Sequence, residues 1–349
     1  MTDVSIEQNL IAIDLGNGTT SYIAGNGKKG SFPSLVALHK DTSGLGAGVA
    51  KEVFKMKDGK TYLVGESCRD EGARSRSTDS SFYSSETIHI LLLKVLEECE
   101  IKNPIIVTGL PTEWYEQEVK AFEDNIRRWA KGEGYQVKFV KVVPQWAGPW
   151  FDDQLEDENG ARIPLDIVMR GKWGIIDIGQ GTTDIGQFTN GRVSDQRHGE
   201  SKGVSDIHKS IFTTLKTQPE SILADGKRNA YLPKEFNLDR QTTEHTIDQW
   251  LREGHIIWRG KRLDMQVISL PARNEFAKDV LPRCIEKVWG STDFLQGIIV
   301  AGGGATVLGL NVFKQYIFCP IYKSATPELS IVRGFYRLAK TQILPKIDQ

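Results

Sequence analysis

The sequence contains little cysteine and no excess of either charge. Four of its 349 residues are cysteines, they lie far apart, and no two form a CxxC pair. This pattern argues against a disulfide framework or a cysteine-based zinc cluster, and it fits a reducing cytosol. Lysine and arginine total 44 against 45 aspartates and glutamates, which gives a formal net charge of −1. We therefore expect no direct, non-specific binding to nucleic acid.

The sequence also lacks the features of a signal peptide and of a membrane span. Its first residues, Met1 to Gln8, are polar and acidic, so we expect no signal peptide. The segment from Phe294 to Phe313 is uncharged for 20 residues, which is long enough to cross a bilayer. Because it holds five glycines, we interpret it as a buried strand, a glycine turn and the start of a helix. The prediction is a cytoplasmic protein without membrane contact.

Glycine, in contrast, is abundant. The chain has 34 glycines among 349 residues, about 10%, against roughly 7% in average proteins. Glycine destabilises the interior of helices and strands, so an excess indicates positions where the backbone needs unusual freedom. The length exceeds what one hydrophobic core usually fills, which predicts two domains of ~150 residues each.

Two of the glycine clusters form a repeated heptad. Asp14 begins Asp-Leu-Gly-Asn-Gly-Thr-Thr, and Asp177 begins Asp-Ile-Gly-Gln-Gly-Thr-Thr. Five of the seven positions are identical, an apolar run precedes each heptad, and 163 residues separate the two. This repetition predicts one strand–turn–strand unit used twice, once in each domain. The alternative is a pair of ordinary Asp-Gly hairpin turns, although a two-residue turn needs less than this pattern contains.

The residue types of the heptad are suited to binding phosphate. Glycines let backbone N–H groups approach an anion closely, and clustered N–H groups form an anion nest. Threonine hydroxyls add further donors. A carboxylate repels phosphate, so the leading aspartate is better explained as facing Mg²⁺ or its bound waters. Two such hairpins facing each other predict a polyphosphate site in a cleft between two similar domains.

The hydrophobic patterns along the chain predict an α/β fold in which a βββαβα unit occurs twice. Two inserted lobes are predicted at about 40–80 and 218–265, the second with a turn at 258–262. In the first half the predicted strands include 32–38, 104–108 and 137–143, and the predicted helices are 87–100 and 113–131. In the second half the strands are three within 173–198, then 297–301 and 317–321, and the helices are 204–216, 269–288 and 327–340.

These features together resemble the actin–hexokinase–chaperone ATPase superfamily over nearly the whole chain. Within it, the chain is most similar to the bacterial actin-like ATPases of the plasmid-segregation ParM/StbA group. Three segments carry this narrower resemblance: Val107–Pro111, Val142–Gln145 and Ser201–Ile207. The resemblance implies an actin-like (ribonuclease H-like) fold around a nucleotide cleft. It implies a first domain of 1–145 completed by 326–349, and a second domain of 146–325.

The resemblance also implies a role for individual residues. Asp14 and Asp177 would organise Mg²⁺ and its waters, Gln145 would position the attacking water, and Asp184 would be a second residue that organises water. Ser21 stands where the family often has a lysine, so a phosphate contact is missing unless another cation replaces it. The expected nucleotide contacts are Gly16, Asn17, Gly18, Thr19, Gly179, Gln180, Gly181, Thr182, Gly302, Gly303 and Gly304, the last three behind the adenosine.

Each of these residues also has a purely structural interpretation. The two leading aspartates can cap turns, Gln145 can simply begin a helix, and Asp184 can be an ordinary strand residue. The glycine triple can serve close packing of a helix against a strand.

The implied function is that of an ATPase that forms filaments. Its cofactors would be ATP, or GTP, and Mg²⁺. Its partners would be further copies of itself, joined head-to-tail, and a DNA-bound adaptor protein through which filaments separate plasmid copies. A small-molecule kinase of the same superfamily and a non-catalytic ATP-binding scaffold are the alternatives.

Overall fold

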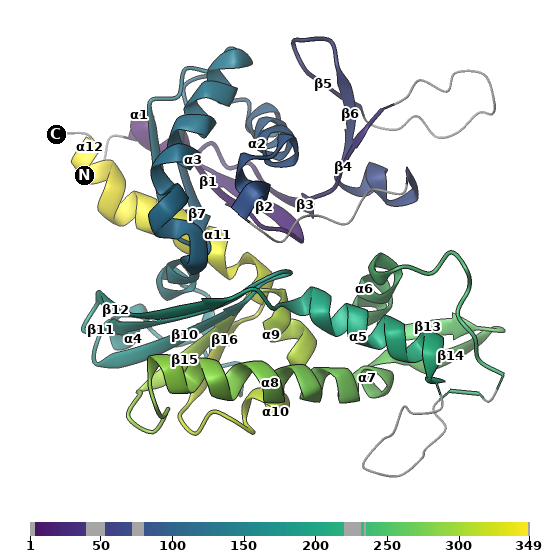
Figure 1. Ribbon diagram of the computed structural model, residues 1–349. Coiled ribbons are helices and arrows are strands. Elements are labelled where there is room, and N and C mark those ends of the chain that lie inside the picture. Colours follow the sequence, from purple (N-terminus) through teal and green to yellow (C-terminus); the bar gives the residue numbers. More distant parts are fainter. Residues whose placement is uncertain (1–3, 40–52, 72–79, 220–231, 234, 348–349) are drawn as a thin grey trace, which may run out of the picture.

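The computed structural model describes residues 4–39, 53–71, 80–219, 232–233 and 235–347. Two mixed sheets form its centre, and helices cover both faces of each sheet (Figure 1). None of the described helices is both long and apolar enough to cross a bilayer.

The first sheet has the strand order β3-β2-β1-β7-β8. Its first three strands form an antiparallel meander, and β7 and β8 run parallel to β1. Alternate residues of β1 face opposite sides, as a strand requires: Ile11 and Ile13 pack toward α2 and α3, and Leu10 and Ala12 pack toward α11. The elements are β1 Leu10–Leu15, β2 Thr19–Ala24, β3 Lys29–Pro33, α2 Glu86–Cys99, β7 Ile105–Leu110, α3 Thr112–Gly132, β8 Phe139–Pro144 and α11 Ser330–Leu338.

The second sheet repeats this arrangement in the order β12-β11-β10-β15-β16-β9. Again an antiparallel meander is followed by two parallel strands, and β9 is added antiparallel at the edge. The predicted duplication of the βββαβα unit is therefore confirmed. The elements are β9 Leu155–Glu156, α4 Leu165–Val168, β10 Lys172–Ile178, β11 Thr183–Thr189, β12 Arg192–Glu200, α5 Val204–Thr217, α8 Leu270–Val288, β15 Gly297–Ala301, α9 Gly303–Leu308, α10 Leu310–Phe313 and β16 Ile321–Ser324.

Smaller elements extend from each sheet. Beside the first sheet lies a three-stranded sheet of β4 Val36–Leu38, β5 Val53–Lys55 and β6 Thr61–Val64. Beside the second lie α6 Glu244–Glu253, the hairpin of β13 His255–Trp258 and β14 Lys261–Asp264, and α7 Met265–Ile268. Of these segments, β5, β6, α6 and the β13–β14 hairpin fall in the two predicted lobes, whereas β4 lies before the first lobe and α7 extends beyond the second. Residues 40–52, 72–79, 220–231 and 234 are outside the described residues. The predicted turn at 258–262 is confirmed, because Arg259 and Gly260 adopt φ of 47° and 75° between the two strands.

Three predicted element boundaries were wrong. The single strand expected at 32–38 is two strands, because Pro33 has no N–H to continue the ladder and ends β3. The strand expected at 317–321 begins only at Ile321. The Ile317 N–H still bonds to the Phe313 carbonyl, which continues the preceding helical turn. The helix expected at 327–340 begins at Ser330 after a 3₁₀ turn that starts with Pro327.

Two segments that pass between the sheets cross each other at a pair of glycines. The 3₁₀ segment η3, Gln145–Phe151, follows β8, and α11 follows β16. A Cβ atom on Gly334 would lie 1.7 Å from the Gly148 carbonyl oxygen, and one on Gly148 would lie 2.9 Å from Ile331 backbone atoms. The two backbones are therefore in direct contact.

Around this crossing, apolar side chains of both sheets form one shared core. Leu10 of β1 and Ile175 of β10 belong to the same buried cluster as Trp146 and Trp150 of η3. The Trp150 ring stacks on Phe188 with centroids 4.2 Å apart and planes 4° from parallel. Because aromatic rings of this size dominate the energetics of a core, the shared cluster fixes the two sheets against each other.

We expect Gly334→Ala to destabilise the protein by about 3 kcal/mol or more, because the added methyl group meets a backbone oxygen that no rotamer change can move. Thermal and urea unfolding would measure this loss. Gly132→Ala is the matched control. A Cβ at this position of α3 meets nothing within 4 Å, so the change should stabilise by up to about 1 kcal/mol. Equal stability of the two variants would contradict the proposed crossing.

Candidate active site

The two heptad turns lie against each other between the sheets. In the first hairpin Asp14 pairs with Ser21, and in the second Asp177 pairs with Asp184, so the leading aspartates occupy equivalent positions. A Cβ atom on Gly18 would lie 3.1 Å from the Gln180 Cβ. Glycine at position 18 thus permits the first turn to approach the second.

Three aspartates are buried beside these turns. Asp14 is 7% exposed, Asp177 3% and Asp184 1%. Burial raises the pKa of Asp14 to about 7, although a hydrogen bond from Gln145 acts in the opposite direction. Burial also raises the pKa of Asp177 well above its usual value, and the negative charges of Asp184 and Asp14 raise it further. These groups favour an added proton or cation.

The donor set suits Mg²⁺. The Asp177 Oδ1 atom is buried and has no hydrogen-bond partner among the described residues, so it is available as a ligand atom for a cation. Mg²⁺ binds through one or two carboxylates and keeps several waters. Asp14 and Asp177, at the matched ends of β1 and β10, fit that requirement as the residues that would hold the ion.

Gln145 is aimed at the first of these carboxylates. Its Nε2 donates to Asp14 Oδ1 at 2.8 Å across 131 positions of sequence. Gln145 is the first residue of η3, directly after β8, so the crossing segment that joins the sheets also positions this amide. A glutamine amide both donates and accepts hydrogen bonds, so it can hold a water beside the carboxylate.

Asp184 is buried in contact with the other half of the molecule. Burial raises its pKa, while hydrogen bonds from Thr112 and Thr182 act to lower it. Its Oδ1 accepts from the Thr112 N–H at 2.8 Å, at the start of α3 on the other sheet. Close by, Ser201 Oγ donates to Glu113 Oε2 at 2.7 Å, and Arg197 of β12 pairs with Glu116 of α3. Asp184 therefore belongs to a contact between the two halves of the molecule.

The three glycines after β15 differ in their surroundings. Gly302 has φ of 75°, and a Cβ there would lie 2.5 Å from Asp177 Oδ1 and 2.4 Å from the Ile178 carbonyl oxygen. A Cβ on Gly304 would meet the Ile178 side chain at 2.3 Å, whereas one on Gly303 would meet nothing within 4 Å. Gly302 and Gly304 thus let this turn lie against the end of β10, and Gly303 is open.

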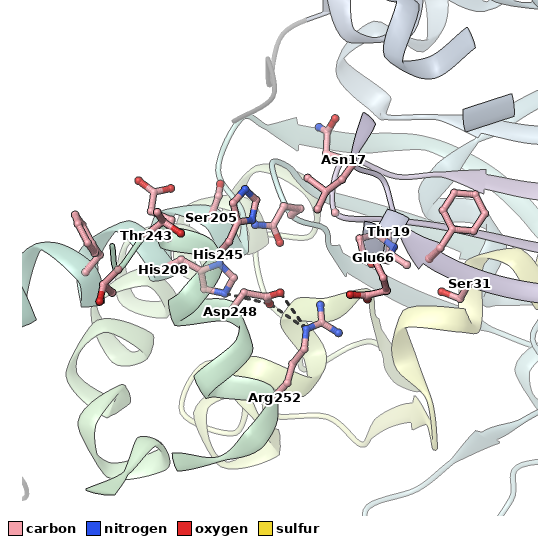
Figure 2. A pocket seen from close by; sticks show the side chains of 18 residues that line it. Asn17, Thr19, Ser31, Glu66, Ser205, His208, Thr243, His245, Asp248 and Arg252 are labelled. Carbon is pink, nitrogen blue, oxygen red and sulfur yellow. Dashed lines mark hydrogen bonds and ion pairs between the residues drawn. The ribbon is translucent and has the colours of Figure 1, made fainter. Parts of the chain in front are cut away.

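A cleft of about 600 Å³ opens beside the turns. Of the predicted site residues, Asn17, Gly18, Thr19 and Gln180 line it. Figure 2 shows the labelled side chains of α5 and α6 on one side of the cleft and those of the first domain on the other. The remaining lining residues are Ser31, Phe32, Pro33, Leu35, Glu66, Ser205, His208, Phe212, Thr242, Thr243, Glu244, His245, Asp248 and Arg252.

The wall formed by α5 and α6 was not predicted from the sequence. His208 is 1% exposed, and burial lowers its pKa to about 4, against the opposing charge of Asp248. It is therefore neutral at pH 7 and presents an uncharged ring to the cleft. Ser205, His208 and Phe212 follow one another at helical spacing, which was the available signal for a shared face.

Ser21 stands where the family often has a lysine, and no unpaired lysine or arginine among the described residues lines the cleft in its place. The Ser21 hydroxyl lies 3.0 Å from the Ser31 hydroxyl, and its side chain is buried. Among the described residues that line the cleft, Arg252 alone is a lysine or arginine. Its Nε already donates to both oxygens of Asp248, at 3.2 and 3.0 Å.

A second group of titratable side chains lies between β12 and α8. His198, Glu200 and Cys284 place one potential ligand atom each within 4.8 Å of one another. However, Arg283 donates two hydrogen bonds to the Glu200 carboxylate, and Lys287 Nζ lies 3.1 Å from His198 Nε2. Side-chain cations already occupy this position, so we interpret the group as an ion-pair network that joins β12 to α8.

Comparison with known proteins identifies both halves of the chain. Residues 12–148 match the family of actin-like proteins, N-terminal domain, and residues 175–313 match the C-terminal domain of the archaeal, MreB-like actin homologues. A curated relative, the archaeal actin homologue of Thermoplasma acidophilum, is 21% identical over 322 residues, which cover 86% of this chain and 89% of the relative.

Solved structures show the same fold. A 15-stranded ParM filament from Clostridium botulinum has a subunit that is 21% identical, with a TM-score of 0.69 over 95% of this chain and 98% of that one. An archaeal actin homologue in complex with ADP is 17% identical, with a TM-score of 0.66 over 95% and 99% of the two chains. The double helical MamK filament is 20% identical, with a TM-score of 0.63 over 95% and 98%.

In the absence of metal and nucleotide, we expect Asp177→Asn to stabilise the protein at pH 8 by on the order of 1–3 kcal/mol, because it removes an unsatisfied buried charge. A raised pKa means that the folded protein binds more protons than the unfolded chain, so wild-type stability falls as pH rises above about 4. The variant should show a weaker fall, measured as thermal unfolding in EDTA between pH 5 and 8.

Asp195→Asn, at an exposed position of β12, is the control for this measurement. It should leave the pH dependence of unfolding as in the wild type. An Asp177→Asn variant that unfolds with the wild-type pH dependence would contradict the assignment of a buried, unpaired carboxylate.

Proposed function

The chain belongs to the actin-like proteins, and on that premise we propose that it is an ATPase that assembles into filaments. ATP would lie with its phosphates against the two turns and its nucleoside in the cleft walled by α5 and α6. The structural relatives with ADP and in filaments support this proposal, since both properties occur in proteins of the same fold.

The observation that carries the catalytic part is the hydrogen bond from Gln145 to Asp14. An amide held at the metal-binding carboxylate, with an N–H and a carbonyl oxygen available, is suited to orient a water for attack on the terminal phosphate. Mg²⁺, when bound, would neutralise charge on the phosphates. Asp14 and Asp177 would hold its water shell, and the N–H groups of the turns would hold the phosphate oxygens.

Hydrolysis would be coupled to the contact between the two halves. Asp184 raises the pKa of Asp177 by its charge and also accepts a hydrogen bond from the N-terminus of α3. A change of charge at Asp177 therefore acts on a group that holds the first domain. This arrangement supports a nucleotide-dependent change in domain angle, which would strengthen or weaken contacts between subunits.

Plasmid segregation through a DNA-bound adaptor protein is the cellular role we propose for such a filament. The net charge of −1 supports an indirect attachment to DNA, because nothing in the overall charge favours direct binding. Either ATP or GTP is compatible with the polar and aromatic side chains of the cleft.

We expect the full-length protein at tens of micromolar to sediment with Mg²⁺ and ATP or GTP, and to stay in the supernatant with EDTA, because subunit contacts depend on the bound nucleotide. High-speed pelleting and electron microscopy would measure this. Protein that remains in the supernatant with every nucleotide would contradict the filament proposal. If a sugar then stimulated hydrolysis, the result would favour a small-molecule kinase.

We expect Gln145→Ala to slow nucleotide hydrolysis by about 10²-fold, because a misplaced attacking water costs about that much. Nucleotide affinity should change little, since the phosphate contacts remain. Steady-state phosphate release and binding of a fluorescent ATP analogue would separate the two effects. Gln136→Ala, at an exposed position outside the site, is the control, and equal hydrolysis rates in the two variants would remove the role assigned to Gln145.

A further inference from the structure

A row of three polar side chains crosses the first sheet beside the candidate active site. Asp14 of β1 is the register partner of Ser21 of β2, and Ser21 is the register partner of Ser31 of β3. Residues directly opposite each other on antiparallel strands have their side chains on one face of the sheet, with Cβ atoms about 5 Å apart. We call Asp14, Ser21 and Ser31 the polar row.

The polar row extends from the cleft to a buried carboxylate. Ser31 is exposed and lines the cleft on the side of the first domain (Figure 2), whereas Ser21 is 1% exposed and Asp14 7%. Gln145 reaches Asp14 from the start of η3, so this face of the sheet looks toward the crossing segment. Side-chain oxygens therefore line this face from the cleft to Asp14.

Hydrogen bonds do not use all of these oxygens. The Ser21 and Ser31 hydroxyls lie 3.0 Å apart and bond to each other. Within the described part of the chain, no hydrogen bond joins the Ser21 hydroxyl to the Asp14 carboxylate, and that carboxylate accepts one side-chain hydrogen bond, from Gln145 to its Oδ1. A carboxylate and a hydroxyl that are neighbours on one face, but are not bonded to each other, leave lone pairs that a cation can share.

The site is also short of positive charge. Three aspartates are buried beside the turns, and burial raises the pKa of Asp14 to about 7. A bound triphosphate would add further negative charge. Among the described residues that line the cleft, the only lysine or arginine is Arg252, whose Nε is bonded to Asp248. A single Mg²⁺ carries two positive charges, which do not balance even the three carboxylates when all are ionised.

We propose that the polar row binds a monovalent alkali-metal cation, which supplies beside Asp14 the positive charge that Ser21 does not. This inference rests on the proposed binding of ATP and adds a second cation to that site. Mg²⁺ requires a near-octahedral shell and binds through carboxylates and water, whereas a larger monovalent ion such as K⁺ is held well by neutral oxygens. One carboxylate and two hydroxyls are therefore suited to the monovalent ion.

The first test measures how tightly the full-length protein with Mg²⁺ binds a fluorescent ATP analogue at pH 8 in KCl, NaCl or choline chloride of equal ionic strength. Affinity should be at least about tenfold higher in KCl or NaCl than in choline chloride, because one contact to a charged group contributes about that factor. The alkali salt that gives the higher affinity identifies the preferred ion.

Two outcomes of this test separate the cation site from the proposed function. Equal affinity in all three salts would overturn the cation site and leave nucleotide binding intact. A protein that binds the analogue in none of the salts would overturn the proposed function, and this inference with it.

The second test supplies the missing charge from the chain itself. Ser21→Lys should bind the analogue in choline chloride as tightly as the wild type does in the preferred alkali salt, and it should lose the response to that salt. Gln136→Lys, which adds the same charge at an exposed position outside the site, is the control and should keep the wild-type salt dependence. A folded Ser21→Lys variant with the wild-type salt dependence would overturn the proposal.

Because Ser21 is buried, a variant at the exposed end of the row provides a test that does not depend on accommodating a lysine. Ser31→Ala should leave the fold intact and raise the alkali-cation concentration for half-maximal affinity at least about threefold, through loss of one ligand. Ser194→Ala is the matched control, because Ser194 lies on β12, the edge strand of the other sheet, as Ser31 lies on β3. The same half-maximal concentration in both variants would overturn the assignment of the ion to the polar row.

Discussion

The contact between Gly148 and Gly334 is the constraint on which the arrangement of the two halves depends. It allows η3 and α11 to cross with their backbones touching, so that side chains from both sheets fill one core around them. The same η3 segment begins with Gln145, whose amide reaches Asp14. Close packing between the sheets and the placement of a candidate catalytic group are thus consequences of one short segment.

The close packing between the sheets is unfavourable for the ionisable side chains that it buries at the candidate active site. Three aspartates are buried where the sheets meet. Burial raises the pKa of each, and the charges of Asp184 and Asp14 raise that of Asp177 further. Asparagine at these positions would remove the buried charges, but it would also remove the carboxylates that we propose hold Mg²⁺. Gly302 also accommodates this carboxylate, because its positive φ and missing Cβ leave room for the Asp177 side chain. A site that holds Mg²⁺, as we propose, would give up stability to do so.

The sequence was sufficient to predict the duplicated fold because the repeated heptads are local signals. Their glycines indicate the backbone conformation of the turns, and their aspartates and threonines indicate the chemistry. Boundaries failed where proline acts on its neighbours, as at Pro33 and Pro327. The α5 and α6 wall was missed for a different reason. Asp248 and Arg252 are distant in sequence from the heptads, and only tertiary packing brings them to the cleft. The individual roles assigned to the site residues remain predictions.

The position of Asp184 connects the second turn to a helix of the first domain. Its carboxylate acts on Asp177 within the second sheet and is held by the N-terminus of α3 from the first. A hydrogen bond from Ser201 to Glu113 and an ion pair between Arg197 and Glu116 join α3 to β12 and to the residue that follows it. Strand β12 in turn is joined to α8 through Glu200 and Arg283. Helix α8 runs from α7 to the loop before β15, so under the proposed function a shift of α3 that follows a change of charge at Asp177 would act along the length of the second domain.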